Sequence, residues 1–271
     1  MTDLPPFETV ADLIREVCAA EIMPLFNRLE SHHLSDKQSG ELVTAADLAS
    51  EARFTEALSR MAPGTVVVGE EAVSADLAVL DRLAGDVPAW IVDPLDGTRN
   101  FAHGLHCFAV IIALADKGET VRGWIYDPLN DVMLMAARGE GAWTGEGQVR
   151  IPQDTSVGNM TGSMNKRRRE RLHRHGETAE PGAVPARVTR YGCTGREYMD
   201  LALGRLHFAE YAMLKPWDHA AGILIHGEAG GCSRFVEDGS AYRPMGIQHE
   251  RLLLAPDNAG WNELDRLLKA I

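Results

Sequence analysis

Residues 90–101 read WIVDPLDGTRNF, an apolar run that ends in two closely spaced acidic residues. The apolar run predicts a buried strand that carries Asp93 at its carboxyl end, and the following proline changes the direction of the chain. Asp96 comes three residues later, so two carboxylates can converge in one turn. Gly97 and Thr98 then open a predicted helix, whose free N–H groups suit a phosphate. Converging carboxylates repel unless a cation separates them, and all-oxygen ligands favour magnesium, manganese or calcium over zinc.

Two further acidic clusters have the same form. Glu70 and Glu71 follow a β-branched run at residues 65–68, which predicts a buried strand. Asp218 lies at the start of a predicted helix whose small residues would let a backbone approach closely. Taken alone, each acidic cluster could be a turn, a helix N-cap or a solvated strand end. Their joint occurrence favours one shared cation site.

These motifs resemble those of a known family. DPLDGT at residues 93–98 with Asn-Phe at 100–101, and WDHAAG at 217–222 with EAGG at 228–231, resemble the two signature motifs of the inositol monophosphatase family. GEE at 69–71 and LVTAAD at 42–47 match two further family segments. The similarity covers nearly the whole chain and is weakest between residues 150 and 190. It implies membership of the magnesium-dependent, lithium-sensitive phosphatases, with Mn²⁺ as an alternative metal.

The resemblance implies a set of metal ligands. Glu70, Asp93 and the backbone carbonyl of Leu95 would hold one magnesium ion. Asp93, Asp96 and Asp218 would hold a second ion, and Glu70 would share a weaker third. Metal-bound water has a lowered pKa, so such a site could hydrolyse a phosphate monoester without a covalent nucleophile.

The resemblance also implies roles around the phosphate. Gly97 and Thr98 would bind phosphate oxygens through their N–H groups. Thr98, polarised by Asp47, would orient the attacking water, with Glu71 as a supporting carboxylate. Lys37 matches a basic residue near the phosphate, although its spacing to the next family segment is one residue short. The expected catalytic residues are Glu70, Thr98, Asp47 and Glu71, and the expected substrate-binding residues are Asp96, Gly97, Thr98, Lys37, Thr194, Tyr211 and Asp218.

One position departs from the inositol-specific members of the family. Many of them carry a glutamate seven residues before the second-motif aspartate, where this chain has Tyr211. Glu210 is the nearest carboxylate, but in a strand at 206–212 adjacent side chains would face opposite ways. Cys193 and Thr194 also differ from the inositol enzymes. The sequence therefore predicts slow turnover of myo-inositol 1-phosphate relative to another phosphate ester.

The expected fold is a layered α/β (α+β) sandwich of αβαβα order, as in the resembled family. Apolar periodicity predicts an opening amphipathic helix kinked at Pro24 and a helix over residues 45–61. Three strand-like runs between 110 and 136 with tight turns predict an antiparallel sheet. We expect an N-terminal α+β subdomain at 1–155 with the main metal motif. A C-terminal α/β subdomain at 156–271 would supply Asp218 to the same catalytic unit.

Composition limits the other possibilities. The 271 residues carry 39 acidic and 27 basic side chains, a formal net charge of -12, which makes nucleic acid an unlikely partner. A basic run at 166–174 favours a solvated helix or loop face over an RNA contact. The four scattered cysteines form no CxxC pair, and we see neither a signal peptide nor an apolar run of about 18 residues. We therefore expect a cytoplasmic protein without a membrane partner, and the family resemblance implies a homodimer.

The substrate stays open among small phosphorylated metabolites. Inositol monophosphate, histidinol phosphate, fructose 1,6-bisphosphate and a 3′-phosphonucleotide all fit the motifs. A non-catalytic binding or regulatory protein on the same fold is the alternative from a different class. That alternative would be favoured by a missing metal ligand, and none is missing.

Overall fold

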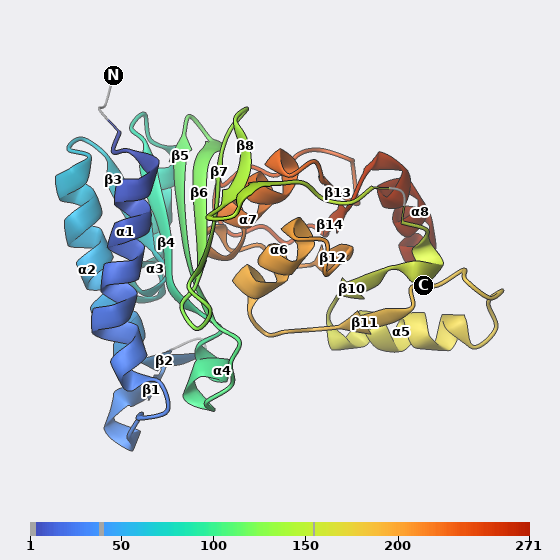
Figure 1. Ribbon diagram of the computed structural model, residues 1–271, viewed down its shortest axis with the longest axis horizontal. Helices are drawn as coiled ribbons and strands as arrows, with labels where there is room; N and C mark the ends of the chain where they lie inside the picture. The colour runs from blue at the N-terminus through green and yellow to red at the C-terminus, as the bar shows by residue number, and fades with distance from the viewer. Residues whose placement is uncertain (1–3, 38–40, 154) are drawn as a thin grey trace.

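The computed structural model describes residues 4–37, 41–153 and 155–271, arranged as stacked layers of helices and sheets (Figure 1). The larger sheet follows chain order and consists of β3 (Val66–Gly69), β4 (Ala89–Asp96), β5 (Ala109–Asp116), β6 (Glu119–Asp127), β7 (Val132–Ala137), β8 (Gly141–Thr144) and β9 (Gly147–Val149). The smaller sheet has the order β11-β10-β12-β14-β13 and consists of β10 (Thr161–Ser163), β11 (Arg187–Thr189), β12 (Phe208–Tyr211), β13 (Cys232–Phe235) and β14 (Leu252–Ala255). A short ribbon pairs β1 (Leu34–Asp36) with β2 (Leu42–Thr44).

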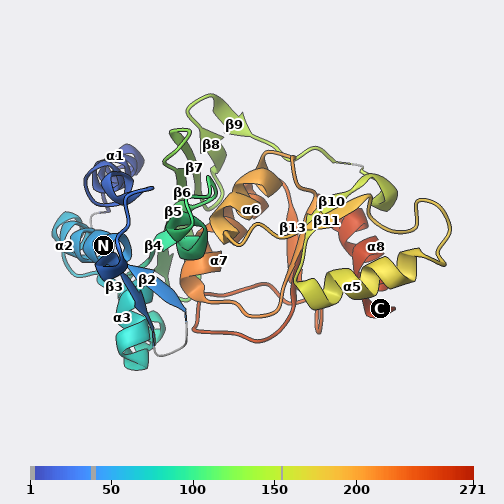
Figure 2. The ribbon, with the colours of Figure 1, turned by 90° about the horizontal axis from the view of Figure 1, so that it is seen from below.

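Helices form the other layers. The α-helices are α1 (Phe7–Val17), α2 (Ala45–Met61), α3 (Glu70–Ala75), α4 (Thr98–Ala102), α5 (Lys166–Gly176), α6 (Thr194–Ala202), α7 (Pro216–Glu228) and α8 (Asn258–Lys269). α1 and α2 cover one face of the larger sheet, and α6 and α7 lie between the two sheets (Figures 1 and 2). α5 and α8 lie against the far side of the smaller sheet (Figure 2). The order helix, sheet, helix, sheet, helix is the predicted αβαβα sandwich.

The side chains of β4 explain how the layers are joined. Trp90 and Val92 pack with α1 and α2, whereas Ala89 and Ile91 pack with α6 and α7. This alternation follows from the two-residue period of a strand. Since both faces are covered by helices, every residue of β4 is buried.

Some sequence predictions are confirmed and others need correction. β5, β6 and β7 pair antiparallel as predicted, and β3, for which no pairing was predicted, pairs with β4 in parallel. The predicted strand end at Glu70 is instead the first residue of a helix, α3. The opening helix ends as an α-helix at Val17 and continues as a π-helical turn, Cys18–Ile22, and a 3₁₀ turn that contains Pro24. The proline therefore follows a change of helix type, which removes the conflict with its missing N–H.

The basic run forms α5, and one of its arginines is not solvated. Arg168 packs inward with a side chain that is 11% exposed, whereas Arg167 beside it is exposed. The prediction of a solvated face thus holds for only part of the run. Among the described residues, no helix has the length and apolarity that a membrane span requires.

Candidate active site

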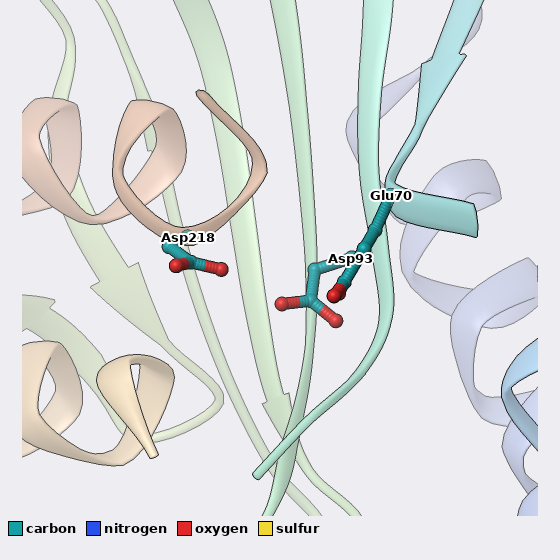
Figure 3. A group of neighbouring side chains, drawn as sticks. All are labelled: Glu70, Asp93 and Asp218. Carbon is teal, nitrogen blue, oxygen red and sulfur yellow. The ribbon is translucent and has the colours of Figure 1, made fainter. Parts of the chain in front are cut away.

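Three carboxylates converge where the two halves of the chain meet. Glu70 begins α3, Asp93 lies on β4 and Asp218 lies in the first turn of α7. Figure 3 shows the three side chains pointing toward a common space, and one oxygen of each lies within 4.8 Å of the others. Residues separated by nearly 150 positions in the sequence therefore share one site.

Local geometry explains the convergence. In the parallel pair of β3 and β4, Gly69 lies opposite Val92, so Glu70 and Asp93 follow at neighbouring positions of the same sheet edge. The pairing of β4 with β5 is irregular between Asp93 and Asp96, and such an irregularity changes the direction in which the side chains at the strand end point. A proline in the first turn begins α7 and leaves its N-terminal end facing the same edge.

Asp93 is the buried member of this carboxylate cluster. Its side chain is 1% exposed; Oδ1 accepts the Leu95 N–H at 3.1 Å. Oδ2 receives no hydrogen bond from the part of the chain that the structure describes. Burial, followed by the neighbouring carboxylates, raises the pKa of Asp93 well above its usual range. An orphaned buried carboxylate oxygen among oxygen donors suits a hard divalent cation, which would remove this repulsion.

Asp96 lies beside the cluster with one oxygen already engaged. Oδ2 accepts the Gly195 N–H at 2.5 Å and lies 3.0 Å from the Cys193 Sγ. Burial raises the pKa of Asp96 to about 6, against the opposing effect of these hydrogen bonds. The contact also connects β4 to the start of α6. Sequence reasoning placed Asp96 at the site but missed that α6 holds its second oxygen.

Thr98 and Asp47 are joined by a hydrogen bond, as the sequence predicts. The Thr98 hydroxyl lies 3.0 Å from Asp47 Oδ1 and 3.0 Å from the Leu95 carbonyl oxygen, and it can donate to either. Asp47 Oδ2 accepts the N–H of Thr44 at 2.8 Å and its hydroxyl at 2.6 Å, in the capping box of α2. Burial raises the pKa of Asp47 to about 6. With its proton directed away, the Thr98 oxygen is left to accept a hydrogen bond from a water.

Gly97 is required by the shape of this turn. Its φ is +85°, a left-handed conformation, and a Cβ there would lie 2.9 Å from the Cys107 carbonyl oxygen. Asn100 in α4 donates to the carbonyls of Cys107 and Tyr191 at 2.8 and 3.0 Å. These bonds hold the motif turn against the segment that leads into α6.

Lys37 lies inside the acidic cluster rather than beside it. Its Nζ is 2.8 Å from Glu70 Oε1 and 2.7 Å from Glu71 Oε1, and its side chain is only 4% exposed. Glu51 was missed by sequence reasoning. It accepts the N–H of Glu71 at 2.7 Å and that of Ala72 at 2.8 Å, and burial raises its pKa to about 7. Its place one helical turn after Asp47 in α2 is the signal that could have found it.

A pocket of about 360 Å³ opens beside the carboxylates, with Thr194 and Tyr211 among its walls. The Tyr211 hydroxyl donates to Glu197 Oε2 at 2.8 Å, and its ring packs against those of Tyr198 and His219. The hydroxyl of Tyr211, an expected substrate-binding residue, is therefore already hydrogen-bonded to the protein.

Glu210 does not replace the missing family glutamate. It lies on β12, and Arg168 of α5 binds it at 2.8 and 3.1 Å. Arg251 lies 3.6 Å away on the same carboxylate. Both Glu210 and Tyr211 line the pocket, but the Glu210 carboxylate is already bound by arginine.

Known proteins match both the sequence and the fold. The model of the inositol monophosphatase family matches residues 5–270. Inositol-1-monophosphatase of Mesorhizobium japonicum is 34% identical to this chain, covering 79% of the chain and 78% of that protein. Nus factor SuhB of Haemophilus influenzae is 32% identical, covering 82% of each.

Solved structures agree with the observed layers. Extragenic suppressor protein suhB from Bartonella henselae superposes with a TM-score of 0.79 at 26% identity, covering 97% of each chain. An IMPase/NADP phosphatase complexed with Mg²⁺ and phosphate gives 0.79 at 20% identity, covering 97% of this chain and 95% of that one. The family model and the relatives above 30% identity cover most of the chain. The chain belongs to the inositol monophosphatase family.

Proposed function

We propose that the chain is a magnesium-dependent phosphatase that hydrolyses a small phosphate monoester. The observation that carries the proposal is the cluster of Glu70, Asp93 and Asp218, in which Asp93 is buried and one of its oxygens has no hydrogen-bond donor among the described residues. Buried like charges persist only where something compensates them. A hard divalent cation is the compensation that an all-oxygen donor set accepts.

The ligand roles follow from this arrangement. Glu70, Asp93, Asp96, Asp218 and the Leu95 carbonyl would hold two or three Mg²⁺ ions, and Mn²⁺ would also fit. Such ions, when bound, neutralise the ester and lower the pKa of a coordinated water. Lys37 forms an ion pair with Glu70 and so balances part of the acidic charge.

The residues of the motif turn would position the reaction. The Thr98 hydroxyl can donate its proton to Asp47, which would leave the hydroxyl oxygen free to orient an attacking water. The N–H groups of Gly97 and Thr98 would bind phosphate oxygens, at a turn that only glycine fits. Glu71 would act through Lys37 as a supporting carboxylate.

The relatives support a phosphatase and raise one alternative. A similar fold is that of an IMPase/NADP phosphatase complexed with Mg²⁺ and phosphate. Other relatives are named Nus factor SuhB, which keeps a regulatory protein as the second candidate. The complete carboxylate set favours the enzyme. A small phosphorylated metabolite as substrate, a homodimer and a cytoplasmic location are further parts of the proposal.

The test is phosphate release from a substrate panel with and without Mg²⁺. The panel contains myo-inositol 1-phosphate, histidinol phosphate, fructose 1,6-bisphosphate and a 3′-phosphonucleotide. We expect at least one ester to be hydrolysed with Mg²⁺ or Mn²⁺, and all activity to be lost in EDTA. Full activity in EDTA, or none toward any ester with metal, would contradict the proposal.

A further inference from the structure

The pocket beside the carboxylate cluster contains acidic side chains that are already engaged. Glu197 accepts hydrogen bonds from the Ser163 hydroxyl at 2.5 Å, the Tyr191 N–H at 2.9 Å and the Tyr211 hydroxyl at 2.8 Å. Three donors leave its two oxygens little capacity for a ligand. The wall carboxylate of Glu197 is thus held by the protein.

A second wall carboxylate, Glu210, is neutralised by arginine. Glu210 is bound in a two-pronged contact by Arg168, and Arg251 lies 3.6 Å away. Lys215, a basic wall residue, is 2.7 Å from Glu41. A neutral polyol would need free acceptors for its hydroxyls. These internal partners engage the acceptors that Glu197, Glu210 and Glu41 would otherwise offer.

Arg190 is different from these wall residues. It is exposed on the pocket wall, and the structure gives its guanidinium neither a hydrogen bond nor an ion pair with any described residue. Its backbone is well placed, because the next residue donates its N–H to Glu197 and accepts from Asn100. Cys193, three residues further, contacts Asp96. Three residues span at most about 10 Å, so the backbone of Arg190 lies close to that of Cys193. Arg190 lines the same pocket as Asp96 and Asp218.

We propose that this pocket binds a leaving group that carries a second anionic group, a phosphate or a carboxylate, and that Arg190 recognises that group. The inference rests on the proposed phosphatase activity and specifies its substrate class. An unpaired guanidinium binds either anion through two parallel hydrogen bonds. It selects against the cationic histidinol phosphate and gives no advantage to a neutral polyol such as inositol.

The test compares esters that differ only in the second anion. Adenosine 3′,5′-bisphosphate is compared with adenosine 3′-phosphate, and 2-phosphoglycerate with glycerol 2-phosphate, so that phosphate and carboxylate are separate arms. We expect wild type to prefer the more anionic member of at least one pair by about tenfold in kcat/KM, mainly through KM. The preference should shrink at high ionic strength, because Arg190 is exposed.

Variants of Arg190 test whether this residue causes the preference for the more anionic ester. Arg190→Gln should remove it while leaving the singly anionic ester within about twofold, and Arg190→Lys should keep part of it. Arg187→Gln is the matched control, since Arg187 is also exposed, lies three residues earlier and is not part of this pocket. Equal kcat/KM within both pairs, or a preference that survives in Arg190→Gln, would overturn the inference.

A failure of the proposed function would give a different result. If none of the four esters is hydrolysed with Mg²⁺, the phosphatase proposal fails. Calorimetric titration with adenosine 3′,5′-bisphosphate then tests the role of Arg190 separately from activity. Wild type should then still bind adenosine 3′,5′-bisphosphate about tenfold more tightly than Arg190→Gln does. Equal binding by the two proteins would overturn it.

Discussion

The molecule contains two carboxylate centres that are compensated in different ways. In the smaller sheet, Glu210 is 2% exposed at its side chain and is bound by Arg168 at two positions. At the edge of the larger sheet, Glu70, Asp93 and Asp218 converge. Only Lys37 forms a described ion pair with that cluster, through Glu70.

The difference separates a structural site from a binding site. Two arginines supply what Glu210 needs, so that centre is complete without a ligand. The three-carboxylate cluster keeps an orphaned Asp93 oxygen and a raised pKa, which lowers stability unless a cation binds. The free-energy cost of placing carboxylate charge inside the protein is therefore offset by arginines at Glu210 and by a bound cation at the three-carboxylate cluster.

Asp93→Asn should have the largest effect on activity. The change removes a charge that the bound cations need, so kcat/KM should fall about a thousandfold, or roughly 4 kcal/mol. The metal-free variant should unfold no more easily than metal-free wild type, because the change relieves carboxylate repulsion. Phosphate release and urea unfolding measure the two effects.

The control for this variant is Asp81→Asn, which neutralises an exposed aspartate. It should change neither measurement. A stability loss in metal-free Asp93→Asn with unchanged kcat/KM would contradict this prediction. It would show that the cluster, like Glu210, is a structural site.

Arg168→Met should give the opposite pattern at the other centre. It leaves Glu210 buried with only the more distant Arg251, so the free energy of unfolding should fall by about 3 kcal/mol. Urea denaturation measures this, and Arg167→Met, an exposed neighbour in the same helix, is the matched control. Adding Glu210→Gln to Arg168→Met should recover part of the loss. If the single variant is as stable as the control, Glu210 does not need Arg168.

Thr98→Ala tests the hydrogen bond between Thr98 and Asp47, a carboxylate that belongs to neither centre. The variant keeps the backbone N–H but loses the hydroxyl, so kcat should fall about a hundredfold, near 2.7 kcal/mol, with little change in KM. Thr98→Ser, which keeps a hydroxyl, is the control and should retain most of kcat. An effect confined to KM would make Thr98 a binding residue.

Sequence reasoning could find the cluster because its members follow local signals. Asp93 ends an apolar run, Glu70 follows a β-branched run and Asp218 opens a helix, so each is visible within a few residues. The layered fold was equally accessible, because the motifs resemble a family whose fold is known and the apolar patterns agree with it. The division near residue 155 stays a prediction.

The rest depends on tertiary pairing that no local pattern carries. The role of Glu51 depends on α3, because Glu51 accepts hydrogen bonds from the N–H groups of Glu71 and Ala72 at the start of that helix. Arg168 looks like the other members of a basic run until α5 is docked on Glu210. The parallel pairing of β3 with β4 is likewise a long-range choice. Long-range ion pairs and strand order are set by packing, which is why they were missed.

The thermal response to Mg²⁺ tests the comparison most directly. A ligand that binds only the folded protein at ten times its Kd stabilises it by about 1.4 kcal/mol. Mg²⁺ should therefore raise the Tm of wild type and of Arg168→Met above an ionic-strength control with NaCl, and it should leave Asp93→Asn unchanged. A Tm of wild type that does not respond to Mg²⁺, or an equal rise in Asp93→Asn, would contradict the claim that the three carboxylates are completed by a cation.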